Sequence, residues 1–152
     1  MNIRGSMVAS SLALALALAL ALSMPVAALA AERIEVIEHA DTDATLDLGA
    51  QGDSVGDLLT WANPIFDAAN KTQIGTDQGY CVRVVVGKSW ECTWTTLLKG
   101  GQIMVEGPFY DDKDSLLTII GGTGKYAGAR GSMKLHARDA KGSSYTFIFE
   151  LL

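Results

Sequence analysis

After residue 30, the apolar positions along the chain come in short runs that suit strands rather than helices. Apolar and polar residues alternate over 33–39, and Gly, Asp, Asn and Lys separate the later apolar runs at strand-like intervals. Those later runs cover residues 56–61, 64–66, 78–86, 89–98, 102–106, 115–120, 125–138 and 143–151. The pattern predicts seven or eight antiparallel strands in tandem, joined by connections of turn length.

Such a chain either stacks as a sandwich or closes as a barrel. Closure removes the edge strands that a secreted domain would otherwise expose. The glycines of the segment 121–131 favour a barrel, because sharp corners and kinked strands need residues without a Cβ atom. The same glycines do not have the spacing of a nucleotide-binding loop, and no helix follows them. We therefore predict an all-β fold, a closed eight-stranded antiparallel β-barrel with an apolar cavity.

The first 30 residues have the pattern of a cleaved signal peptide. Arg4 gives a positive start, residues 11–22 alternate Leu and Ala, and Ala28-Leu29-Ala30 resembles a cleavage site. A membrane anchor is the alternative, but Pro25 interrupts the run too early for a span. We therefore expect residues 1–30 to be removed and residues 31–152 to form one barrel domain, secreted or periplasmic, with no stable membrane insertion after cleavage.

The charge balance bears on possible partners. The chain has 12 Lys and Arg against 17 Asp and Glu, a formal net charge of −5. Loss of Arg4 with the leader makes the mature protein more acidic still. No cluster of basic residues offsets this balance, which argues against nucleic acid or an anionic membrane as a partner.

The two cysteines, Cys81 and Cys92, flank a predicted turn around 86–88 and lie on the same face of a predicted hairpin. They could form a cross-strand disulfide in an oxidising compartment, or remain as two free thiols lining the interior. His39 and His136 are expected on the surface, so no metal-ligand spacing and no nucleophilic triad can be assembled. We expect neither a metal nor another cofactor.

From Val55 to the C-terminus the sequence resembles the allene oxide cyclases, members of a barrel superfamily that also contains the dirigent proteins. The Gly-Gly-Thr-Gly segment is shared with dirigent proteins, whereas Gly-Pro-aromatic followed by Asp-Ser is more specific to the cyclases. The matching stretches are 56–58, 61–63, 74–75, 79–82, 105–109, 114–116, 119–124, 128–131 and 145–147.

The resemblance implies an isomerase that closes an unstable fatty-acid allene oxide, or a related polyene, to a chiral ring inside an apolar tunnel. Carried over by position, Glu38 is a carboxylate that assists opening, and Asn63 helps to hold a water that binds the oxygen. Cys81 is expected near the reacting centre. The remaining expected substrate-binding residues form the walls of the cavity: Trp61, Trp90 and Phe109. The family also implies a homo-oligomer, a trimer.

The chain departs from the family's pattern just after Glu38. The family's second asparagine falls on Ala40, and its serine-proline pair has no counterpart in 41–44. On pattern alone Glu38 is an ordinary solvent-facing carboxylate. Three hypotheses therefore remain: an isomerase, a non-catalytic dirigent-like barrel that binds or orients a small hydrophobic ligand, and a structural barrel with a filled core. The first two predict a cavity.

Overall fold

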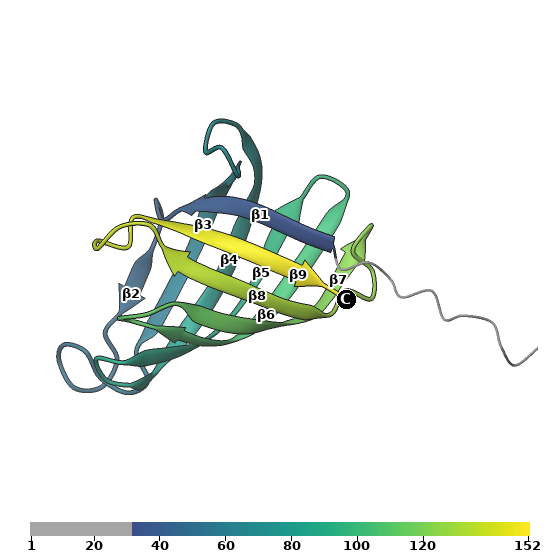
Figure 1. The fold of residues 1–152 in the computed structure, drawn as a ribbon. Helices are drawn as coiled ribbons and strands as arrows, with labels where there is room; N and C mark the ends of the chain where they lie inside the picture. Colours follow the sequence, from purple (N-terminus) through teal and green to yellow (C-terminus); the bar gives the residue numbers. More distant parts are fainter. Residues whose placement is uncertain (1–31) are drawn as a thin grey trace, which may run out of the picture.

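The computed structural model describes residues 32–152, so the predicted signal peptide lies outside the described residues. The described part consists of nine strands joined by short loops (Figure 1). The strands are β1 (Glu32–His39), β2 (Ala44–Leu46), β3 (Leu58–Asp67), β4 (Gln73–Val85), β5 (Ser89–Leu98), β6 (Gly101–Tyr110), β7 (Ser115–Gly124), β8 (Gly131–Ala137) and β9 (Ser144–Leu151).

Eight of these strands form a closed antiparallel barrel, which confirms the predicted fold class. From β3 to β9 each strand pairs with the next along the chain, and β1 pairs with β9. The ring closes where residues 36–38 of β1 pair with residues 65–67 of β3. The short β2 pairs with the first three residues of β3, so β3 has two different neighbours along one side. Within residues 32–152 no helix is long and apolar enough to span a membrane.

Two prolines lie inside strands, although the pattern began a separate short run at Pro64 and placed Pro108 in a loop. Pro64 belongs to β3, between the part that pairs with β2 and the part that pairs with β1. Pro108 belongs to β6, which pairs with β5 there but with β7 only up to Glu106. At both prolines, one side of the strand makes no hydrogen-bond ladder with a neighbouring strand. The backbone N–H that proline lacks is therefore not needed there. Residues 125–130, predicted as the start of a strand, form a turn before β8.

The barrel interior is apolar at one end and partly polar at the other. Fully buried side chains fill the end where β1 begins and β9 finishes, among them Val36, Ile103, Met133 and Phe149. Toward the other end, where β1 finishes and β9 begins, several polar side chains are also buried, among them Glu38, Asn63 and Asp77. Buried polar groups need partners, so this end is the place to look for a site.

Cys81 and Cys92 are bonded to each other. They stand directly opposite in the β4–β5 ladder, with Cα atoms 4.0 Å apart, and form a disulfide. The sequence allowed either a disulfide or two free thiols for these cysteines, and the structure contains the disulfide. Its position near the middle of a long hairpin joins β4 and β5 covalently inside the barrel.

Candidate functional site

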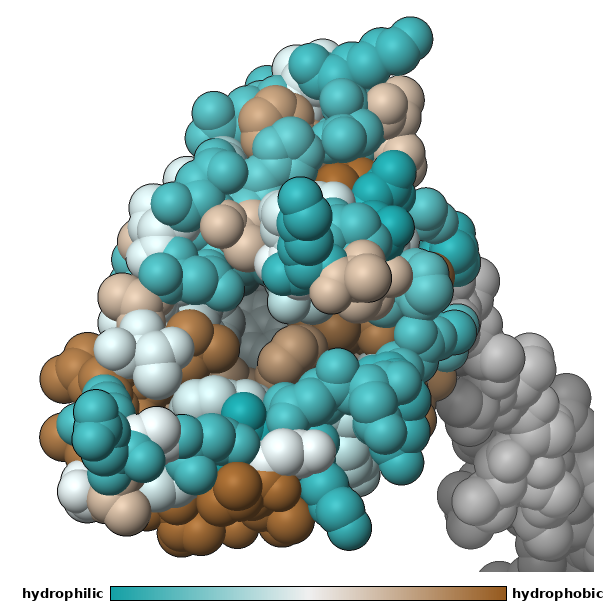
Figure 2. Space-filling model, turned by 90° about the vertical axis from the view of Figure 1, so that its left-hand side faces the viewer, coloured by the Kyte–Doolittle hydropathy of each residue, from teal (hydrophilic) through white to brown (hydrophobic). Residues whose placement is uncertain are grey.

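A cavity of about 50 Å³ lies inside the barrel at the end where β1 finishes. Five aromatic side chains line it: Trp61, Trp94, Phe109, Tyr145 and Phe147. The other lining residues are Glu38, Asp43, Leu59, Cys81, Cys92 and Leu135. Figure 2 looks onto this end of the molecule and shows a hollow at its centre with hydrophobic and hydrophilic residues around it. The core is therefore not completely filled at this end of the barrel, where a small recess remains.

Gly79 on β4 makes room for the two tryptophans. It stands opposite Trp61 of β3 on one side and opposite Trp94 of β5 on the other. A Cβ atom on Gly79 would lie 2.3 Å from the Cβ atom of Trp94 and 2.5 Å from the Thr93 carbonyl oxygen. The missing side chain lets the two indoles meet edge to face over β4, with ring centroids 5.8 Å apart. One glycine thus sets the aromatic wall of the cavity.

The chemically distinctive feature is a pair of buried carboxyl groups, Glu38 on β1 and Asp77 on β4. Glu38 is 5% exposed and Asp77 is fully buried. Asn63 donates a hydrogen bond from Nδ2 to Glu38 Oε1 at 2.9 Å, and Trp61 donates from Nε1 to Asp77 Oδ2 at 3.0 Å. The two carboxyl groups lie close enough for each to change the pKa of the other, and Asp77 Oδ1 has no hydrogen-bond partner among the described residues. Two buried carboxylates so close together repel each other, which favours a proton on one of them.

The environment keeps that proton in place near neutral pH. Burial raises the pKa of Glu38 well above its usual range, the charge of Asp77 raises it further, and the bond from Asn63 opposes both effects. Burial also raises the pKa of Asp77, to about 7, against the lowering effect of the Trp61 bond. Because the two groups interact, their protons belong to the pair. The pair can therefore give up or accept a proton within the physiological range.

Asn63 positions the pair rather than presenting free hydrogen-bonding groups to the cavity. Its Nδ2 donates to Glu38 at 2.9 Å and to Asp43 Oδ1 at 2.8 Å. Its Oδ1 accepts from the Thr42 backbone N–H at 2.9 Å and from the Thr42 hydroxyl at 3.0 Å. All four hydrogen-bonding positions of this amide are thus used by protein groups. The predicted role in holding a water would need one of these bonds to break.

The remaining predicted residues divide into those at the cavity and one away from it. Phe109 lies at the cavity and meets Tyr145 edge to face, with centroids 5.9 Å apart. Burial, with a contribution from the nearby charge of Glu38, raises the pKa of Tyr145 to about 12, so this hydroxyl keeps its proton. Cys81 lines the cavity as a disulfide sulfur, so no thiol is available there. Trp90, in contrast to the expectation, is not among the lining residues, because its ring packs under Arg83.

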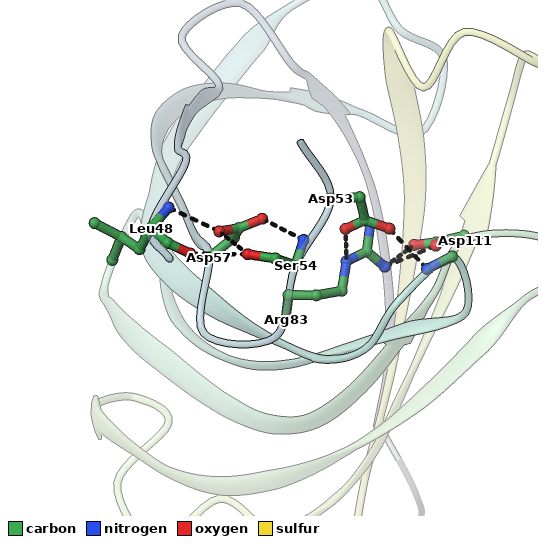
Figure 3. A network of polar contacts seen from close by, with 7 residues as sticks. Leu48, Asp53, Ser54, Asp57, Arg83 and Asp111 are labelled. Carbon is green, nitrogen blue, oxygen red and sulfur yellow. Dashed lines mark hydrogen bonds and ion pairs between the residues drawn. The ribbon is translucent and has the colours of Figure 1, made fainter. Parts of the chain in front are cut away.

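Arg83 organises the loops at the same end of the barrel. Its guanidinium lies 4.0 Å over the Trp90 ring, forms an ion pair with Asp53 at 2.6 Å, and donates twice to Asp111. Figure 3 shows how this group joins the loop before β3 to the loop after β6. On the neighbouring stretch, Asp57 accepts hydrogen bonds from the backbone N–H groups of Leu48 and Ser54. These contacts fix the loop 47–57 beside the cavity end.

Other parts of the described chain hold fewer groups that could bind a ligand or take part in a reaction. A depression of about 330 Å³ at the opposite end is lined by Lys125, Tyr126, Arg130 and neighbouring residues, and holds none of the predicted site residues. Among residues 32–152, no three His, Cys, Asp or Glu side chains are placed to hold a metal ion. The carboxyl pair at the aromatic cavity is therefore the best candidate site.

The comparisons with known proteins agree with this architecture. A family model described as allene oxide cyclase matches residues 29–149, and the chain belongs to that family. Among solved structures, a pyocyanin demethylase is similar at 23% identity and a TM-score of 0.66, over 78% of this chain and all of the other. A pterocarpan synthase dirigent protein is similar at 13% identity and a TM-score of 0.62, over 80% and 92%. The Diels–Alderase AbmU from Streptomyces koyangensis is similar at 17% identity and a TM-score of 0.60, over 98% and 84%.

Sequence reasoning missed four residues of the site: Asp43, Asp77, Trp94 and Tyr145. Asp77 and Trp94 had an available signal, because strict alternation from Cys81 and Cys92 places both on the inward face of their strands. Asp43 had none, since it lies in a loop between β1 and β2 and reaches the site only through the fold of that loop.

Proposed function

We propose that the protein is an isomerase or cyclase in which Glu38 donates one proton to the substrate as a general acid and later accepts that proton again as a general base. The observation that supports this proposal most directly is the buried Glu38–Asp77 pair beside an aromatic cavity. A carboxylic acid that stays protonated at neutral pH is a competent general acid, and its conjugate base accepts the proton later. No cofactor is needed for such a step.

The family suggests the reaction, cyclisation of an unstable unsaturated epoxide such as a fatty-acid allene oxide. Glu38 protonates the epoxide oxygen as the carbon–oxygen bond breaks, and the remaining positive charge is delocalised over the adjacent double bonds. A carbon–carbon bond then closes the ring, and the hydroxyl proton returns to Glu38 as the ketone forms. Substrate and product have the same atoms. The similarity to a Diels–Alderase, another ring-forming catalyst, supports cyclisation chemistry in a barrel of this kind.

The walls determine which face of the substrate reacts. Aromatic side chains hold one conformation of the reacting segment and keep bulk water from the open cation. The cavity is partly open to solvent, and its volume of about 50 Å³ is well below the ~150 Å³ that encloses a benzene ring. Only the reacting segment of a long chain therefore enters, while its tail stays outside the cavity.

An extracytoplasmic location fits this proposal. The Cys81–Cys92 disulfide is consistent with an oxidising compartment, and secretion or export to a periplasm would place the protein there. The trimer implied by the family remains a prediction, to be checked by light scattering.

The experiment is a coupled assay in which the protein receives a freshly generated fatty-acid allene oxide and the products are separated on a chiral column. We expect an enantiomeric excess over the protein-free control. Glu38→Gln keeps the size of the side chain and removes its acid function, so turnover should fall by about 100-fold or more. Binding of an inert epoxide analogue should be unchanged. Glu91→Gln, on the outward face of β5, is the matched control.

The pH dependence supplies an independent test. Because the acid form of Glu38 is required, kcat/KM should fall as pH rises through the raised pKa of the pair, and the Glu38→Gln variant should lose this dependence. A racemic product with wild-type protein would favour an orienting barrel without catalysis. Unchanged turnover in Glu38→Gln would remove Glu38 from the mechanism.

A further inference from the structure

Two buried polar side chains that are neighbours in the β4–β5 ladder each have an atom without a hydrogen-bond partner. Asp77 on β4 stands opposite Thr96 on β5, and both side chains are fully buried inside the barrel. Among the described residues, neither Asp77 Oδ1 nor Thr96 Oγ1 has a hydrogen-bond partner. Because buried polar groups rarely remain unpaired, a hydrogen bond between these two atoms is favoured.

Such a bond needs only a small change of side-chain conformation. Residues that stand opposite each other on antiparallel strands have Cβ atoms roughly 4.5–5.5 Å apart, within reach of two short polar side chains. Rotation about the first side-chain torsion of Thr96 moves its hydroxyl among three staggered positions, and the backbone pairing of β4 with β5 is not affected. A hydroxyl can donate, whereas an ionised carboxylate can only accept, so Thr96 is the donor.

The two carboxyl groups of the pair have unequal surroundings. Glu38 lines the cavity, whereas Asp77 is not among the lining residues. Glu38 receives one side-chain donor, Asn63 Nδ2 at 2.9 Å. Asp77 receives Trp61 Nε1 on Oδ2 at 3.0 Å, and the Thr96 hydroxyl would add a donor on Oδ1. Donors stabilise a carboxylate in its ionised form, so the second donor favours charge on Asp77 and leaves the shared proton on Glu38.

Uncharged donors carry this task because no cation lies at the cavity. None of the lining residues in the described part of the chain is Lys, Arg or His. Asp43, before β2, adds negative charge, and Tyr145 on β9 keeps its proton. Arg83, further along β4, is held by Asp53 and Asp111. The inward-facing residues of β3 and β5 include no titratable group. Amide, indole and hydroxyl donors therefore determine which member of the pair ionises.

We propose that Thr96 is a positioning residue of the carboxyl pair: its hydroxyl donates to Asp77 Oδ1 and so keeps the shared proton on Glu38, beside the cavity. Thr96 is not among the lining residues, so it acts through Asp77 and not on a substrate. The inference rests on the proposed function, since it explains how Glu38 remains the acid of the pair.

Thr96→Val tests this assignment, because valine keeps the branched shape of threonine and loses only the hydroxyl. Valine is also a strong strand former, so the barrel should form. Carbon NMR of the Asp and Glu carboxyl groups follows the protonation of the pair without any substrate. In the wild type, the first proton to leave as pH rises should come mainly from Asp77. In Thr96→Val this step should move up by about one pH unit, because ionised Asp77 has lost a donor. Glu38 should then take a larger share of the step.

Two further variants separate the hydroxyl from a general effect of substitution. Thr96→Ser keeps the hydroxyl and should restore the wild-type titration. Thr95→Val, at the neighbouring position on the outward face of β5, should leave the titration unchanged. In the wild type, the methyl signal of Thr96 should also follow the Asp77 step, because its hydroxyl binds the group that ionises.

The proposal is overturned if Thr96→Val titrates like the wild type, or if Thr96→Ser titrates like Thr96→Val. A methyl signal of Thr96 that is independent of pH would have the same meaning. None of these measurements involves turnover. Failure of this inference is therefore distinct from failure of the proposed function, which Glu38→Gln tests in the chiral assay.

Discussion

At the level of single residues, the missing side chain of Gly79 shapes the site as much as the hydrogen-bonding groups of Asn63 do. Gly79 presents no side chain, and the two indoles that define the cavity meet across it. Asn63 presents four hydrogen-bonding groups, and all are used to hold Glu38, Asp43 and the Thr42 segment. The Glu38 carboxyl group is thus held by one amide and bordered by one packed aromatic wall.

The role of Gly79 can be tested by Gly79→Ala. The added methyl would collide with the Trp94 Cβ atom and with the Thr93 carbonyl, which belongs to the backbone and cannot move aside cheaply. We expect a loss of about 1–3 kcal/mol in the free energy of unfolding, measured by urea denaturation. Gly121→Ala is the matched control, because a Cβ atom there has nothing within 4 Å. Equal stability of the two variants would contradict the close packing.

At the level of elements, the loop 47–57 is fastened to the barrel by β4. Arg83 binds Asp53 in the loop and Asp111 after β6, and its backbone pairs with Gly56 and Asp57. This side chain lies on the inward face of β4, close to the cavity end. The loop position beside the site therefore depends on one guanidinium.

Replacement of Arg83 by Met should loosen that loop without unfolding the barrel. Hydrogen exchange measured by mass spectrometry should accelerate in residues 47–57 and around 111–114, because the ion pairs are gone while the strand ladders remain. Arg33→Met, at an exposed position on β1, should leave both segments unchanged. Uniformly faster exchange over all strands would show that Arg83 supports the whole fold instead.

The elements also show what the sequence could and could not predict. Alternation and turn residues predicted strands such as 89–98 with the observed bounds, since a barrel strand alternates inward and outward side chains. The continuous β3 was missed because Pro64 interrupts the pattern, although the proline lies between two partner strands. The Glu38–Asp77 pair was missed because its members lie on β1 and β4, which do not pair with each other, and come together only because β3 pairs with both strands. Periodicity within one strand carries no information on such contacts.

For the whole molecule, the buried pair makes stability depend on pH. In the unfolded chain Asp77 has an ordinary pKa of 3.8, whereas in the barrel it is raised to about 7. Between these two pKa values the folded state binds more protons than the unfolded state does. The contribution of Asp77 to stability is therefore complete below its unfolded pKa and is lost as pH rises through its folded pKa. We expect the free energy of unfolding to fall by roughly 1–3 kcal/mol across this range.

Asp77→Asn isolates that contribution. The amide cannot ionise, so the decline in unfolding free energy over the same range should become shallower, as measured by urea denaturation at a series of pH values. A carboxylate with a lowered pKa, such as Asp139, works in the opposite sense, because the stability that it adds at neutral pH is lost as pH falls into the acid range. A decline that is identical in wild type and variant would show that Asp77 is not the group responsible.

The central claim is that Glu38 and Asp77 share a proton at neutral pH, and carbon NMR of the side-chain carboxyl groups measures this directly. Selective labelling of Glu and Asp carboxyl carbons, with Glu38→Gln and Asp77→Asn for assignment, gives a titration curve for each group. We predict that neither signal moves near its ordinary pKa of about 4 and that both change together at a higher pH, as a coupled pair. A Glu38 signal that titrates near 4 would show two ordinary carboxylates and contradict the account.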